Sequence, residues 1–206
     1  MKKILIIVLL VGFAHHFQND IKRFFDDGLF DNAGKPRAVL FTQPGCNKPC
    51  EDARRNLDQR DVAYEEVDLD QDRSLLKEIG LPATLPFLVV GYDKVYGYNP
   101  GLYGATLAAN FGEQVLTSTE QRIFSEHFDE NGEPKIVLYG TTWCGYCTKL
   151  RNDFNENNVD FVDYDVEKPA KKVWLLEALR IQGYPTVYIG YRRVNGSDYK
   201  AVMAAL

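Results

Sequence analysis

The chain has 206 residues, of which 45% are hydrophobic and 26% are charged, a balance that excludes wholesale disorder, collagen-like sequence and a multi-span membrane protein. Its 29 acidic residues outnumber its 24 basic ones, and the net charge of −5 argues against a dedicated nucleic-acid binder. Four cysteines are too few for a disulfide-built scaffold, but they form two close pairs, Cys46 with Cys50 and Cys144 with Cys147.

The first fourteen residues differ from the rest of the chain. Lys2 and Lys3 precede an apolar run over residues 4–14 that ends in small residues, the pattern of a secretory signal. As a helix this run reaches only about 16 Å, against a hydrocarbon core of about 30 Å. We therefore expect residues 1–14 to be a signal peptide or N-terminal anchor of an exported protein, in the periplasm or another extracytoplasmic compartment. A buried N-terminal strand or helix is the alternative.

The chain contains an internal repeat. Residues 30–41 (FDNAGKPRAVLF) align with residues 128–139 (FDENGEPKIVLY) at an offset of 98. The same offset aligns the first cysteine of each pair, whereas the second cysteine aligns at 97 and a later proline at 99. Because the order of features is kept and the small slips fit loops, we interpret the chain as two copies of one domain.

Each copy predicts the element order βαβαββα. Apolar runs at 38–41 and 136–139 predict buried strands, and the helix after each cysteine pair has apolar positions at helical spacing. The following elements are expected at 63–67 and 160–164 (strands), 73–79 and 171–181 (helices), and 87–90 and 186–189 (strands), before a short strand and a last helix.

This pattern predicts an α/β fold of two tandem domains, each a small mixed sheet flanked by helices. The expected divisions are a leading helix and linker over 15–35, a first domain over 36–115, a linker helix over 116–134 and a second domain over 135–206. His127, in the linker helix, is expected at the surface.

In the second copy the cysteine pair lies where a strand ends and a helix begins. A helix N-terminus carries partial positive charge and free N–H groups, which favour a thiolate, so we expect a lowered pKa for the Cys144 thiol. Cys147 lies one turn further on, on the core-facing side, where it can reach the Cys144 sulfur but is poorly placed to meet substrate. The pattern predicts that Cys144 is a nucleophile toward disulfides and Cys147 a resolving thiol.

Two further elements follow in the second copy. Pro185 precedes an apolar strand, and a cis bond after Tyr184 would expose the Tyr184 backbone beside the cysteines to an extended substrate. In Gly196-Ser197-Asp198, Ser197 is expected to cap the last helix, and free N–H groups there suit a carboxylate.

With these three ordered elements the second copy, residues 135–206, resembles a glutaredoxin of the thioredoxin-like superfamily. The segment 141–147 (TTWCGYC) is most similar to the glutaredoxin-like proteins called mycoredoxins. The resemblance implies a thiol–disulfide oxidoreductase with no tightly bound cofactor and with glutathione or another small thiol as co-substrate. Expected partners are protein or small-molecule disulfides and a thiol reductant or reductase, with no nucleic acid and with a membrane only through the N-terminal anchor.

We expect substrate to contact residues around the cysteines and the prolines: Thr142, Trp143, Tyr146, Tyr184, Pro185, Gly196, Ser197 and Asp198, with Leu85 and Pro86 in the first copy. Trp143 either gates the nucleophile or is an exposed aromatic at a strand end. Lys149 and Arg151 either add positive potential near the site or form a solvated helix face. Tyrosines 92, 96, 98 and 103 are expected to serve packing.

Two departures from the family's pattern lie at the cysteines or just before them. Glutaredoxins that use glutathione usually have a lysine three residues before the first cysteine, where this chain has Thr141 and, in the first copy, Gln43. The thiol donor is therefore left open between glutathione, another small thiol and a protein. The first copy also has a C-x₃-C pair, Cys46 with Cys50, in place of CxxC.

Alternatives to redox catalysis stay open at this point. Cys46 and Cys50 could form a second redox pair, bind a soft metal such as Cu(I) or Zn, or belong to a degenerate recognition copy. For the whole chain, one rival function is a Cu(I), Zn or iron–sulfur binding or delivery protein that uses the same thiols. The other is a non-catalytic, thioredoxin-like adaptor that binds a substrate.

Overall fold

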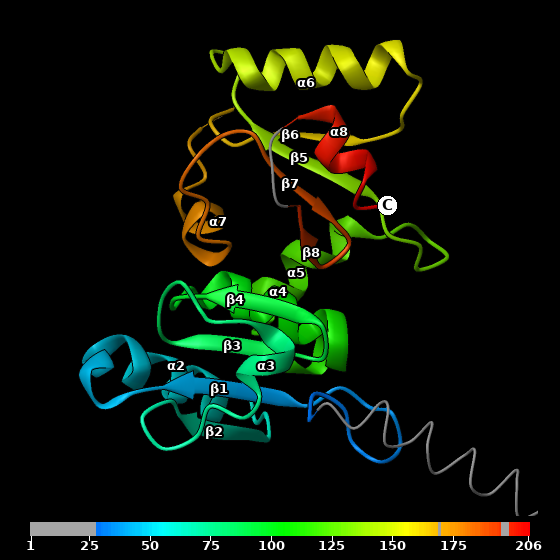
Figure 1. The fold of residues 1–206 in the computed structure, drawn as a ribbon. Helices are drawn as coiled ribbons and strands as arrows, with labels where there is room; N and C mark the ends of the chain where they lie inside the picture. Colours follow the sequence, from blue (N-terminus) through cyan, green and yellow to red (C-terminus); the bar gives the residue numbers. More distant parts are fainter. Residues whose placement is uncertain (1–27, 169, 195–197) are drawn as a thin grey trace, which may run out of the picture.

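The computed structural model describes residues 28–168, 170–194 and 198–206. The signal or anchor expected over 1–14, and residues 15–27 of the leading segment, lie outside the described residues. The described part forms two α/β domains, drawn with the first below the second in Figure 1. No helix within that part is long and apolar enough to cross a membrane.

The first domain is a four-stranded sheet with helices on both faces. Its elements are β1 (Ala38–Thr42), the 3₁₀ turn η1 (Pro44–Cys46), α2 (Asn47–Gln59), β2 (Tyr64–Asp68), α3 (Leu76–Ile79), β3 (Phe87–Val90), β4 (Asp93–Tyr96) and α4 (Pro100–Phe111). The strand order is β2-β1-β3-β4, with only β1 and β2 parallel. Alternation along β1 sends Ala38 and Leu40 to the core under α2 and α4, and Val39 and Phe41 to the core under α3.

The second domain has the same plan. Its elements are β5 (Ile136–Gly140), α6 (Gly145–Glu156), β6 (Val162–Asp165), α7 (Val173–Ala178), β7 (Thr186–Ile189), β8 (Arg192–Arg193) and α8 (Tyr199–Met203). The strand order is β6-β5-β7-β8, again with only the first two strands along the chain parallel. The predicted α/β class, with two mixed sheets and the order βαβαββα in each, is confirmed.

Several element bounds differ from the prediction. The helices expected over 73–79 and 171–181 are shorter, because α3 begins at Leu76 and α7 spans only Val173–Ala178. Ahead of α3, the Asp68 and Asp72 carboxylates accept hydrogen bonds from backbone N–H groups two residues further on, and such local turns compete with helix formation. Strands β2 and β6 begin one and two residues later than expected.

Between the domains lie η2 (Glu113–Val115), α5 (Ser118–Phe124) and η3 (Ser125–His127). Helix therefore occupies only part of the linker expected over 116–134. The rest is a turn that ends in an isolated β-bridge between Phe128 and Pro134. An equivalent turn ahead of β1 has a β-bridge between Phe30 and Pro36.

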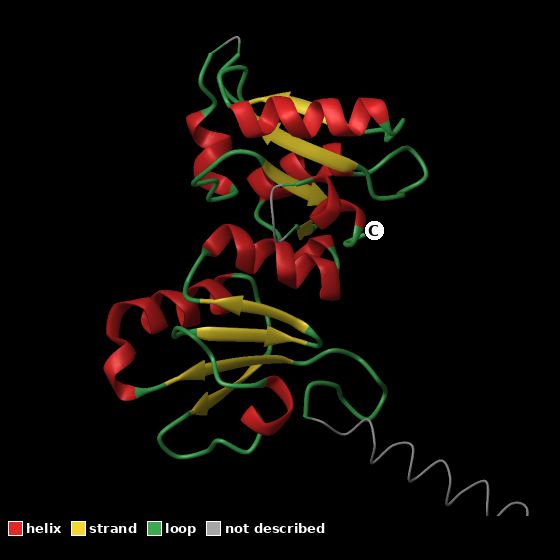
Figure 2. Ribbon diagram, turned by 45° about the horizontal axis from the view of Figure 1, so that its top comes forward, coloured by secondary structure: helices red, strands yellow, loops and turns green. Residues whose placement is uncertain are grey.

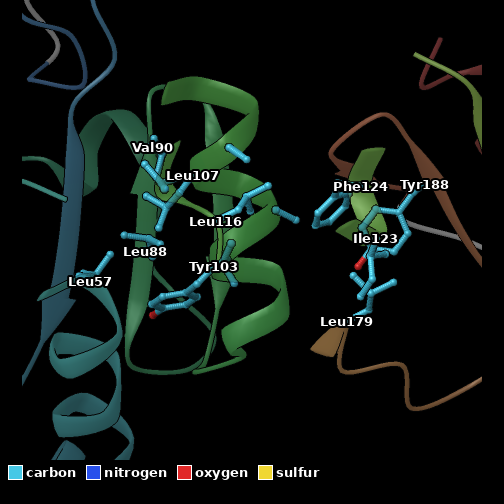
Figure 3. Packing of buried hydrophobic residues seen from close by; sticks show 14 of the residues in the cluster. Leu57, Leu88, Val90, Tyr103, Leu107, Leu116, Ile123, Phe124, Leu179 and Tyr188 are labelled. Atoms are coloured by element: carbon cyan, nitrogen blue, oxygen red, sulfur yellow. The ribbon is translucent and has the colours of Figure 1, made fainter. Parts of the chain in front are cut away.

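The two domains share one hydrophobic core. Figure 3 shows members of this cluster from α2, β3, α4, α5, β7 and the end of α7, among them Leu57, Leu88, Tyr103, Leu107, Ile123, Phe124, Leu179 and Tyr188. Helix α4 lies between the two sheets (Figure 2), and a Cβ atom at Gly101 would come within 2.6 Å of the Leu179 carbonyl carbon. The domains approach each other closely because position 101 is a glycine.

A buried ion pair fixes the linker to the first domain. The guanidinium of Arg60, which follows α2, donates two hydrogen bonds of 2.8 Å to the carboxylate of Glu120 on α5. Arg60 also donates to the carbonyls of Val115 and Pro100, and Glu120 accepts from the backbone N–H of Thr117. Both side chains are almost fully buried, so removal of one partner would leave the other charge uncompensated.

We predict that Glu120→Ala lowers the free energy of unfolding by about 3–5 kcal/mol, the usual cost of breaking a buried pair. Urea unfolding followed by circular dichroism measures this change. Arg55→Ala, which removes an exposed ion pair with Asp52, is the matched control and should cost much less. Equal losses in the two variants would contradict the prediction.

His127 is fully buried, so the expectation that it lies at the surface was wrong. Its Nδ1 donates to the carbonyl of Gly190 at 2.7 Å, and its Nε2 accepts from the Tyr139 hydroxyl at 2.7 Å. Burial lowers the pKa of His127 to about 4, with a smaller opposing effect of the hydrogen bond to Gly190. The imidazole is therefore neutral and ties η3 to β5 and to the turn between β7 and β8.

Acid should weaken the second domain through His127. Between its ordinary pKa of 6.5 and the folded value of about 4, the unfolded chain binds the proton more tightly, so stability falls as pH falls through this window. The loss from this group should reach roughly 3 kcal/mol below pH 4. Unfolding free energies measured from pH 7 to 4 should decline less steeply for His127→Gln than for the unaltered protein. Parallel pH profiles would rule the prediction out.

Candidate functional site

The cysteine pair of the second domain lies at the start of α6. Cys144 is the N-cap of this helix and forms a disulfide with Cys147, their Cα atoms 5.2 Å apart. The backbone N–H of Cys147 donates to the Cys144 Sγ atom at 3.1 Å. This free N–H of the first helical turn is the kind of group that stabilises negative charge on a sulfur.

Cys147 is buried beneath Cys144. Its sulfur lies against Gly140, where an added Cβ atom would come within 3.0 Å of it. The position agrees with the sequence argument that this sulfur can meet the Cys144 sulfur more readily than an incoming substrate.

Both cations on α6 are paired with acids. Lys149 bonds Asp153 one turn along, and Arg151 makes two hydrogen bonds of 2.8 and 3.0 Å to Asp163 on β6. Arg151 also donates to the carbonyl of Thr141, at the start of the loop that carries Cys144. The role of Arg151 is therefore to position this loop, and neither cation is an unpaired source of positive potential.

The first domain has the equivalent pair, Arg54 on α2 with Glu66 on β2, joined at 2.6–3.1 Å. Hydrogen bonding to Arg54 is the main cause of a lowered pKa of Glu66. In both copies the acid follows the arginine by twelve residues, a regularity in the repeat from which the pairing could have been found.

Exposed aromatic rings surround the Cys144–Cys147 disulfide. Trp143 and Tyr146 are 68% and 74% exposed, and Thr142 is also exposed. The Trp143 indole lies edge-on to Tyr184 with ring centroids 6.1 Å apart, and it donates to the Glu167 carboxylate at 2.7 Å. The structure thus brings the cysteine loop next to the Tyr184–Pro185 loop, as the sequence predicts. It adds Glu167, which no pattern in the sequence indicates.

The two prolines have the predicted geometry. The bonds Leu85–Pro86 and Tyr184–Pro185 are both cis. Partial burial, with the nearby Glu167 carboxylate as the smaller cause, raises the pKa of Tyr184. That these loops bind substrate stays a prediction.

Of the predicted Gly196-Ser197-Asp198 site, Gly196 and Ser197 lie outside the described residues. The N-cap of α8 is Asp198, whose carboxylate accepts from the N–H of Ala201 at 2.9 Å, and not Ser197 as expected. Asp198 lines a small pocket with Lys149 and Lys200, and neither Cys144 nor Cys147 is part of its lining.

Thr141 and Gln43 stand where glutathione-using glutaredoxins usually have a lysine, and their surroundings differ. Thr141 is fully buried, and its Oγ1 has no hydrogen-bond partner in the described structure. Gln43 is exposed and lines a pocket of about 530 Å³ together with Cys46, Thr84 and Leu85.

The first domain therefore also places its cysteine pair beside its proline loop, but its helix start differs. Cys46 and Cys50 form a disulfide with Cα atoms 5.6 Å apart. The additional residue, Asn47, takes a positive φ of 45°, which non-glycine residues rarely adopt. Cys46 is the N-cap of α2, yet its side chain accepts no hydrogen bond from the helix.

No cluster of three or more His, Cys, Asp or Glu side chains suited to a metal ion occurs in residues 28–168, 170–194 and 198–206. In the part of the chain that is described, each cysteine is bonded to the other member of its pair.

Two α/β domains, each with a cysteine pair at its first helix and a cis-proline ahead of its third strand, define a tandem thioredoxin-like protein. The glutaredoxin family model matches residues 38–93 and 136–194, so the resemblance extends to the first domain. A glutaredoxin of Pseudomonas aeruginosa is 30% identical over 66 residues, which are 32% of this chain and 79% of that protein. The chain belongs to the glutaredoxin family.

Arg151 should matter for turnover more than for folding. We predict that Arg151→Met lowers kcat/KM for a small disulfide by about tenfold, because the Thr141 carbonyl and the cysteine loop lose their anchor. Lys149→Met, two residues away on the same helix and bonded to Asp153, is the control. Steady-state kinetics with the melting temperature of each variant make the test. Unchanged kinetics in Arg151→Met, or a loss explained by unfolding, would count against it.

Proposed function

We propose that the second domain catalyses thiol–disulfide exchange, with Cys144 as the nucleophile and Cys147 as the resolving thiol. The observation that carries this proposal is the hydrogen bond from the helix N-terminus to the Cys144 sulfur. The same bond would stabilise a Cys144 thiolate in the reduced protein. Membership of the glutaredoxin family supports the same chemistry.

The reaction consists of two exchanges. The Cys144 thiolate attacks one sulfur of a target disulfide, and the second target sulfur leaves as a thiolate and takes a proton from solvent. The Cys147 thiol then loses its proton to solvent, and its thiolate attacks the Cys144 sulfur of the mixed disulfide. The other target sulfur leaves as a thiolate and takes a proton from solvent. The target has gained two electrons, and the Cys144–Cys147 disulfide has formed. Glutathione, another small thiol or a protein reductase returns the two electrons.

The first domain is the candidate second redox pair. Its Cys46–Cys50 disulfide is closed, and Cys46 borders the pocket shared with Leu85. Because the Cys46 sulfur accepts no bond from its helix, we expect it to be a weaker nucleophile than Cys144. The charged and apolar start of the sequence supports export or anchoring as the setting for both pairs.

The two cysteines of the second domain should respond differently to substitution. Cys144→Ser should abolish reduction of a small disulfide, whereas Cys147→Ser should accumulate a mixed disulfide that mass spectrometry detects on Cys144. In thiol buffers of defined potential, free thiols are alkylated and counted by mass spectrometry. The Cys144/Cys147 pair should be oxidised reversibly between about −270 and −120 mV. Absence of reversible oxidation in this range would refute catalysis, and a stoichiometric metal that Cys144→Ser loses would favour metal delivery.

A further inference from the structure

A cleft of about 1220 Å³ separates the two domains beside the Tyr184–Pro185 loop. One wall consists of β4 and the first half of α4. The other consists of the segment 182–186, β8 and the end of the chain after α8. Figure 1 shows β8 of the second domain next to α4 of the first. The cleft exists only because the shared core holds the domains together.

The cleft offers main-chain groups to an extended chain. Strand β4 is one edge of the first sheet, and β8 is one edge of the second. An edge strand has N–H and C=O groups on its outer side that can pair with an added strand. Two tyrosine rings of the β4 wall, Tyr92 and Tyr96, pack against Phe30 and Phe87 as expected, and they are still 68% and 50% exposed.

Positive charge predominates in the cleft of a protein whose net charge is −5. Its lining includes three cations, Lys94, Arg192 and Arg193, and one acid, Asp93. Asp93 bonds Arg192 at 2.9 Å across the domains. Lys94 donates only to the Ile79 carbonyl, and Arg193 donates only weakly, at 3.4 Å, to the Thr186 hydroxyl. In the described structure these two cations therefore have no acidic partner.

The cleft leads to the reactive cysteine. Tyr184 and Pro185 line it, and the Tyr184 ring contacts Trp143, the residue before Cys144. A chain that runs along β4 and over Tyr184 would thus reach the disulfide of the second domain. A small disulfide needs only the second domain.

We propose that this cleft binds an extended, acidic polypeptide segment of a protein substrate, next to the disulfide that Cys144 attacks. This inference rests on the proposed function for the reaction but assigns the first domain a role in substrate selection. The acidic side chains of the segment pair with Lys94 and Arg193, its backbone pairs with the β4 edge, and Tyr92 and Tyr96 pack against its apolar side chains.

Binding can be measured without catalysis. The probe is a fluorescein-labelled, cysteine-free peptide with glutamate at alternate positions, so that a strand places every carboxylate on one face. Fluorescence anisotropy with the full chain should show saturable binding that weakens with salt. The same peptide with lysine in place of glutamate should not bind.

Charge reversal in the cleft is the decisive comparison. Lys94→Glu, an exposed change, should raise the Kd by a factor of about three to ten, and adding Arg193→Glu should raise it further. Lys35→Glu makes the same charge change on an exposed turn outside the cleft and should bind as the unaltered chain does. Circular dichroism checks that each variant is folded, and Lys94→Glu alone suffices if the double variant is not.

The proposal is overturned if the acidic peptide does not bind, if it binds no better than the lysine peptide, or if Lys94→Glu and Lys35→Glu bind equally. Rates of disulfide reduction show whether the cleft proposal or the proposed function has failed. Lys94→Glu should reduce a small disulfide at the normal rate but a disulfide peptide with glutamate flanks at least threefold more slowly. If the unaltered chain reduces neither substrate, the proposed function fails, while the binding measurement still decides the cleft.

Discussion

The buried pair of Arg60 and Glu120 is the constraint on which the arrangement of the two domains depends. Arg60 follows the helix that begins with the first cysteine pair, and it bonds a carbonyl at the start of α4 as well as the acid on α5. Helix α5 in turn contributes Ile123 and Phe124 to the core shared with the second domain. Two charges that must stay paired therefore hold the linker in one orientation, and the second sheet packs against it.

The two cysteine pairs differ by one residue in their spacing, and this changes the hydrogen bonding of the first sulfur. Both copies place a cysteine at the N-cap of a helix, and both pack an arginine of that helix against an acid of the neighbouring strand. With two residues between the cysteines, the N–H of Cys147 points at the Cys144 sulfur. With three residues between the cysteines, Asn47 takes a positive φ, and the Cys46 sulfur accepts no hydrogen bond from its helix. The same fold thus gives the two disulfides different electrostatic surroundings.

Local and periodic features could be predicted from the sequence. Alternating apolar strands, the order of elements and the cis-prolines at 86 and 185 depend on neighbouring residues or on the repeat, and the structure contains them. His127 could not be placed, because its burial depends on Gly190 and Tyr139, which are distant in sequence. Glu167 was missed for the same reason, since a surface glutamate gains its partner Trp143 only through the fold. The length of helix α3 was predicted too long, because aspartates that form turns are also typical of the start of a helix.

The position of the cleft bears on why a second domain is retained. A single domain, with its buried disulfide next to the exposed rings of Trp143 and Tyr146, has only local contacts with which to select a target. Discrimination between targets needs contacts away from the reacting sulfurs, and those contacts raise kcat/KM only for chains that also reach them. In the proposed complex, strand β4 provides such contacts beside Tyr184, because Gly101 allows α4 to approach the end of α7. The proposed selection of substrate therefore depends on the close packing of the two domains.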